Sequence, residues 1–161
     1  MQDGPVPGQR ERDKQGRARN ARPRDSLGRP LPRGAAGVAR VPEDLVLPPL
    51  ASLAEAQRLL DVGMPFHAHE VLEATWKAAP EQERDLWQGL AQLAVGYTHL
   101  LRGNPAGATT LLQRAHRRVS SYLDAPPYGV DVDGLLAWTE RVLASLQATG
   151  VTKADPPRLR G

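Results

Sequence analysis

The 161-residue chain contains no cysteine, few aromatic residues and no long apolar run. The absence of cysteine excludes a disulfide framework and a thiolate metal site. No apolar stretch approaches the roughly 18 residues needed to cross a bilayer, and the polar, Arg-rich start lacks the apolar centre of a secretory signal. We therefore expect a cytoplasmic protein that does not bind membranes.

Positive charge is concentrated at the two ends of the chain. Residues 1–40 contain ten Arg or Lys against four Asp or Glu, a net +6, whereas residues 41–149 contain eight against thirteen, a net −5. Residues 150–161 contain three against one, a net +2. Arg outnumbers Lys eighteen to three, which is typical of a GC-rich bacterial genome.

Composition divides the chain into three parts. Residues 1–40 contain Gly and Pro throughout and no aromatic residue, so they cannot bury enough apolar area to offset the cost of ordering the backbone. We predict a disordered basic arm over residues 1–40, one helical domain over residues 43–149, and a flexible C-terminal tail over residues 150–161.

Apolar residues recur with helical period through the middle of the chain, between Pro and Gly residues that start and stop helices. The sequence predicts an all-α fold, a compact bundle of about five helices. The predicted helices run from an N-cap at Ser52 to Gly63, from Pro65 to Pro80, from Glu81 to Arg102, from Pro105 to near Tyr122, and from Asp131 or Asp133 to Thr149.

A repeat of 40 residues underlies this pattern. Leu53–Leu72 aligns with Leu93–Leu112, and seven of the twenty positions are identical. The identities fall at turn and packing positions, as a repeated helix–turn–helix unit requires. We predict two tetratricopeptide-like units plus a closing helix.

The two units differ in chemistry. The second unit has Gly107, Thr109, Thr110 and Gln113 where the first has His67, His69, Glu70 and Glu73. The scaffold therefore does not require these imidazoles and carboxylates, and a role particular to the first unit has to explain them.

The helical spacing predicts a polar cluster between the second and third helices. His69 and Glu73 share one flank of the second helix, and Gln88 and Gln92 form a row on the third with His99. Antiparallel packing would bring the two sets to similar heights. The full candidate set is His69, Glu70, Glu73, Trp76, Gln88, Gln92 and His99.

Three interpretations of this cluster stay open. It is a buried hydrogen-bond network. It is a ligand pocket or an enzyme site in which Glu73 tunes His69 as an acid–base pair. Or it is a metal site, although the second helix supplies only that pair and amides are poor ligands of transition metals. We predict no metal and no cofactor.

The same residues resemble a known family. A His-Glu-x-x-Glu-x-x-Trp helix and a following Gln-Gly-hydrophobic-x-Gln helix are matched by His69, Glu70, Glu73, Trp76, Gln88, Gly89 and Gln92. With His99 and the Arg102–Ala108 turn, these motifs resemble domain-of-unknown-function family 309, small all-helical proteins of bacteria, archaea and plastid lineages. The resemblance covers roughly Leu53 to Tyr122. It implies a helical fold and no activity.

The basic arm contains an Arg-x-Arg-x-x-Arg-x-Arg run formed by Arg17, Arg19, Arg22 and Arg24. Such a run can neutralise phosphates of RNA or DNA without reading sequence. The arm is otherwise a solvated tail, or it folds back onto the acidic domain.

From the sequence we expect a non-enzymatic helical module that binds a small ligand or a protein, with a homo-oligomer left open by the apolar fifth helix. The alternatives are a hydrolase-like or metal-assisted enzyme centred on His69 and Glu73, and a nucleic-acid accessory protein that acts through its arm.

Overall fold

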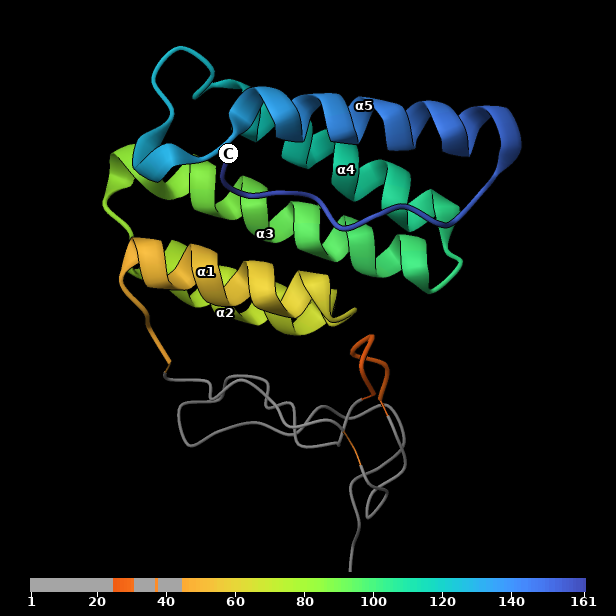
Figure 1. Ribbon diagram of the computed structural model, residues 1–161, viewed down its shortest axis with the longest axis horizontal. Helices are drawn as coiled ribbons and strands as arrows, with labels where there is room; N and C mark the ends of the chain where they lie inside the picture. Colours follow the sequence, from red (N-terminus) through yellow and green to blue (C-terminus); the bar gives the residue numbers. More distant parts are fainter. Residues whose placement is uncertain (1–24, 31–36, 38–44) are drawn as a thin grey trace, which may run out of the picture.

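The structure is a computed structural model that describes residues 25–30, 37 and 45–161. In these ranges the chain forms five α-helices and no β-strand, so the predicted all-α fold is confirmed (Figure 1). The helices are α1 (Pro49–Asp61), α2 (Pro65–Ala78), α3 (Glu81–Leu101), α4 (Pro105–Ser120) and α5 (Val132–Thr149), with a short 3-10 turn at Pro127–Gly129 before α5. None of these helices is long and apolar enough to span a bilayer.

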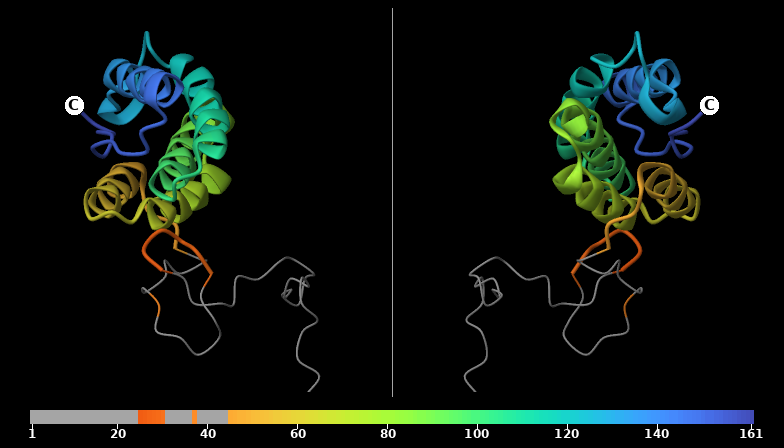
Figure 2. Two further views of the ribbon diagram at one scale, coloured as in Figure 1. Left: turned by 90° about the vertical axis from the view of Figure 1, so that its right-hand side faces the viewer. Right: turned by 90° about the vertical axis from the view of Figure 1, so that its left-hand side faces the viewer.

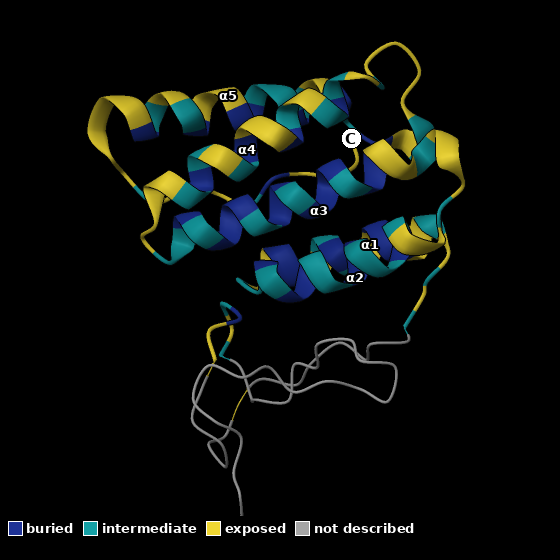
Figure 3. Cartoon of the chain, turned by 180° about the vertical axis from the view of Figure 1, so that it is seen from behind, coloured by how far each residue is buried: buried dark blue, intermediate teal, exposed yellow. Residues whose placement is uncertain are grey.

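The helices pack in chain order, with α2 between α1 and α3, and α4 between α3 and α5. Viewed end-on in Figure 2, α1 and α5 lie on one side of the molecule with the C-terminal segment between them, and α4 lies on the other side. Helix α3 is the centre of this arrangement, and beyond its exposed first turns it is coloured as buried or intermediate in Figure 3.

Small residues let α4 approach α3 closely. A Cβ atom added at Gly96 would lie 2.8 Å from Leu112 Cγ, and one at Gly89 would lie 2.9 Å from Val119 Cγ2. Both distances are too short for a real contact, so the absence of a side chain at the two glycines allows α3 and α4 to pack this closely.

The two turns predicted to be equivalent have the same hydrogen bonds. Met64 N donates to Leu59 O at 2.8 Å, and 40 residues later Asn104 N donates to His99 O at 2.9 Å. The glycine in each turn is left-handed, with φ of 78° at Gly63 and 74° at Gly103. Both are Schellman motifs, which end a helix with a left-handed residue. This identity supports the 40-residue repeat.

The start of α1 differs from the prediction. Ser52 is not the N-cap, because α1 begins at Pro49 after Pro48. Proline suits the first helical position, since its φ is already helical and its missing N–H has no partner there. Ser52 instead points into the core, where its Oγ lies 2.6 Å from Thr75 Oγ1.

The C-terminal residues also differ from the prediction. The expected flexible tail lies against the helices instead, with Leu159 only 1% exposed and an isolated antiparallel bridge between Val130 and Arg160. Hydrogen bonds to three helices hold this segment, so it is part of the folded domain. Of the predicted disordered arm, all but residues 25–30 and 37 lies outside the described residues, including the four-arginine run.

Candidate functional site

The predicted pair of His69 and Glu73 lies together on α2. His69 Nε2 is 3.1 Å from Glu73 Oε2, and Lys77 Nζ is 3.1 Å from Glu73 Oε1. The three residues are spaced four apart, so they follow one face of the helix. The other ring nitrogen, His69 Nδ1, is buried and has no hydrogen-bond partner in the described part of the chain.

This arrangement makes Glu73 a weak proton acceptor. The hydrogen bond from His69, supported by Lys77, lowers the pKa of Glu73 from 4.5 to about 2. A general base works best when its pKa is near the working pH. Glu73 is therefore a fixed negative charge at neutral pH, suited to orienting His69 rather than to taking a proton.

The structure does not join this pair to the amides of α3. Gln88 and Gln92 line a groove with residues of α4, and within the described ranges neither makes a hydrogen bond to His69 or Glu73. The Oε1 atom of Gln92 is buried and accepts no hydrogen bond from any described residue. The predicted network between the second and third helices is therefore not formed by direct hydrogen bonds.

The remaining candidates have separate surroundings. His99 Nδ1 lies 3.1 Å from Asn104 Nδ2 at the turn into α4, and burial, with the nearby charge of Arg102, lowers the pKa of His99. Trp76 packs against the core, and Glu70 is half-buried. The described ranges contain no group of three or more His, Asp or Glu residues placed to hold a metal ion.

A turn formed by residues 25–30 lies against the start of α2, close to His69, and against the end of α3. Arg102 donates to Leu27 O from Nε at 3.0 Å and from Nη2 at 2.7 Å. Gly28 lies so close to Phe66 that an added Cβ would overlap the Phe66 ring. The Phe66 ring in turn contacts His69, with ring centroids 5.5 Å apart. Part of the predicted arm thus folds back onto the domain.

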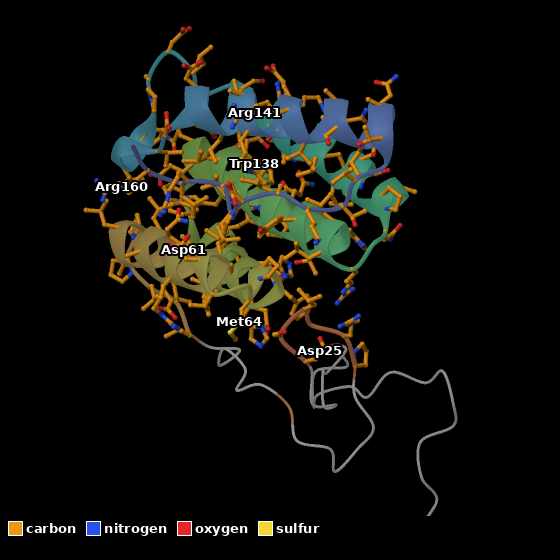
Figure 4. All side chains as sticks on the ribbon, turned by 45° about the vertical axis from the view of Figure 1, so that its right-hand side comes forward. Asp25, Asp61, Met64, Trp138, Arg141 and Arg160 are labelled. Atoms are coloured by element: carbon orange, nitrogen blue, oxygen red, sulfur yellow. The ribbon has the colours of Figure 1, made fainter. Side chains whose placement is uncertain are left out.

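A second surface lies on the other side of α3, where α1, α3 and α5 hold residues 151–161, here called the C-terminal segment. Figure 4 shows this segment passing between Trp138 on α5 and Asp61 on α1. Tyr97 Oη donates to Ala154 O at 2.9 Å, and Trp138 Nε1 donates to Asp155 O at 2.9 Å. Burial, with the charge of Asp155, raises the pKa of Tyr97, so its hydroxyl stays a donor.

Closer to the C-terminus, the Gln57 side chain makes hydrogen bonds to two main-chain groups of the segment. Gln57 Nε2 donates to Pro157 O at 3.0 Å, and Gln57 Oε1 accepts from Leu159 N at 2.8 Å. The Leu159 side chain is buried, and at the start of α5 Asp131 N donates to Leu159 O at 2.9 Å.

Sequence reasoning missed this surface. Gln57, Tyr97 and Trp138 lie on three different helices and share no motif. The available signal was Pro156-Pro157, which favours an extended chain, followed by a single Leu in a polar segment.

Comparison with known proteins agrees with the motifs of α2 and α3. Over 97 residues the chain is 34% identical to "Uncharacterized protein YpuF" of Bacillus subtilis (strain 168). The alignment covers 55% of this chain and 52% of that protein, about half the length of each. No solved structure matches the chain. Residues 53–111, from α1 into α4, match the family described as "Domain of unknown function (DUF309)".

Proposed function

We propose that the helical domain is a non-enzymatic binding module whose groove between α1, α3 and α5 takes an extended polypeptide. One observation carries the proposal. Side chains from all three helices, Gln57, Tyr97 and Trp138, make hydrogen bonds to the main chain of the C-terminal segment.

Contacts of this kind suit peptide recognition. Main-chain hydrogen bonds are available from any sequence and give affinity, whereas a pocket for one side chain gives selectivity. The Gln57 carboxamide supplies one donor and one acceptor, which match the C=O and N–H that it meets. The buried side chain of Leu159 can supply this selectivity, and prolines in the occupant reduce the entropy lost on binding.

The C-terminal segment acts as a tethered occupant. A tethered ligand has an effective concentration on the order of millimolar, so a free peptide competes poorly with it. The wild-type groove is therefore expected to bind a free peptide weakly, and a chain whose own segment binds less well is expected to bind the same peptide more tightly.

The groove extends beyond the matched family region. Residues 53–111 include Gln57 and Tyr97, but α5 with Trp138 and the C-terminal segment lie outside them. The proposal therefore concerns this chain and does not follow from the family match.

The test uses the full chain and a fluorescein-labelled peptide of residues 150–161, followed by fluorescence anisotropy. Leu159→Ala in the protein weakens its own segment but leaves the groove intact. We expect the variant to bind the peptide at least tenfold more tightly than the wild type does. A control peptide that carries Leu159→Ala is expected to bind neither protein well.

A second substitution assigns the binding to the groove. Gln57→Ala, added to the Leu159→Ala protein, removes the two main-chain contacts and is expected to reduce peptide binding. If the Leu159→Ala protein binds the peptide no better than the wild type does, the C-terminal segment is only a structural part of the domain and the proposal is wrong.

A further inference from the structure

The C-terminal half of helix α4 is basic, although the domain around it is acidic. Pro105–Ser120 contains no Asp or Glu, and its last two turns contain Arg114, Arg117 and Arg118. These positions span about 6 Å along the helix axis and lie on one side of it.

The three arginines line a groove of about 480 Å³ between α3 and α4. Its other lining residues are Asp85, Gln88, Gln92 and Ser121. Arg118 Nη1 is paired with Asp85 Oδ1 at 2.6 Å, whereas Arg114 and Arg117 make no ion pair with any described residue. Among the described residues, the one acidic residue of the groove, Asp85, is paired with Arg118, so Arg114 and Arg117 have no ion-pair partner there.

We propose that this groove binds the phosphate backbone of a single-stranded nucleic acid without reading its sequence. Guanidinium groups match phosphate oxygens in a planar, paired geometry. The groove is open, so a strand can lie along it, and it has no aromatic lining residue on which bases would stack.

The site is independent of the peptide groove. The C-terminal segment crosses the near face in Figure 1 and runs behind α3 in Figure 3, whereas the arginine groove lies between α3 and α4. If the arginine groove does not bind nucleic acid, the proposed peptide binding is unaffected. The arginine groove also differs from the predicted role of the Arg17–Arg24 run, because it belongs to the folded domain.

The test measures binding of the full chain to a labelled 12-nucleotide oligothymidylate by fluorescence anisotropy at several salt concentrations. The variant is Arg114→Gln with Arg117→Gln. The matched control is Arg84→Gln with Arg141→Gln, which removes two exposed arginines outside the groove and changes the net charge equally. Thermal unfolding of both proteins checks that each is folded.

For single strands, each phosphate contact contributes about 0.7 to the slope of log affinity against log salt, or about fivefold at 0.1 M salt relative to 1 M. The groove variant is therefore expected to bind about 25-fold more weakly at 0.1 M salt, with a slope smaller by about 1.4, and the control to change less than twofold. Equal losses in both variants would assign binding to overall charge and overturn the proposal. Displacement of the oligonucleotide by polyglutamate at equal charge concentration would also overturn it.

Discussion

Replacing Leu159 with alanine tests the docking of the C-terminal segment through stability. The Leu159 side chain is 1% exposed, and Leu→Ala changes at such sites cost about 2–5 kcal/mol in free energy of unfolding. The substitution leaves the main-chain hydrogen bonds of the segment in place, so its direct effect is the loss of the packing of the Leu159 side chain.

The cost has an upper limit, because the segment can detach without unfolding the helices. Four hydrogen bonds join it to Gln57, Tyr97 and Trp138, each with a net value of about 0.5–1.5 kcal/mol. Once the segment has detached, further weakening of the Leu159 contacts no longer lowers the free energy of unfolding. We therefore expect Leu159→Ala to cost about 2 kcal/mol, at the lower end of its class, and Leu90→Ala in the centre of α3 to cost more.

Two measurements separate detachment from global unfolding. Urea unfolding followed by tryptophan fluorescence gives the change in stability. Limited trypsin digestion of the folded protein reports the segment itself, since Lys153 and Arg158 lie within it. We expect faster cleavage at these two sites in Leu159→Ala and not in Leu90→Ala. Unchanged cleavage together with unchanged stability would refute the reasoning.

Three other predictions concern single contacts. Glu73→Gln is expected to lower the free energy of unfolding by about 1 kcal/mol at pH 7, after allowance for the partial exposure of Glu73. Because the pKa of Glu73 is lowered in the folded protein, this difference should shrink as pH falls from 4.5 to about 2. Urea titrations of both proteins at several pH values will show the change. In a double-mutant cycle, Ser52→Ala and Thr75→Val should be coupled by about 1 kcal/mol, and independent effects would contradict the buried hydrogen bond. Gly28→Ala should release the turn over Phe66, because its φ of 75° and the missing space exclude a side chain; faster amide hydrogen exchange at residues 27 and 29 would show the release, and unchanged exchange would contradict it.

The sequence predicts the helices well because their signals are local. Pro65, Pro80 and Gly103 fix the ends of α2 and α3 to within one or two residues of the expected positions. The one error at a helix start, Ser52, has a simple cause. A serine that points inward and one that caps a helix look alike in a sequence, and only the contact with Thr75 distinguishes them.

The candidate site was predicted less well because it depends on neighbours. Helical spacing places Gln88 and Gln92 on one row of α3, but it does not say which helix that row meets. The amides line a groove with the arginines of α4 and make no hydrogen bond to His69 within the described ranges.

The docked C-terminal segment was beyond local reasoning for a related physical reason. Its composition looks like that of a tail, with one buried leucine, Leu159. Its order comes from main-chain hydrogen bonds to residues far away in the sequence, such as those from Gln57 and Tyr97.

The most direct test of the peptide groove is the NMR resonance of the Trp138 indole N–H, which donates to the main chain of the segment. In the Leu159→Ala protein this resonance should shift away from its wild-type position, and added peptide of residues 150–161 should return it there. A resonance that the peptide leaves unmoved would contradict binding of a polypeptide between α1, α3 and α5.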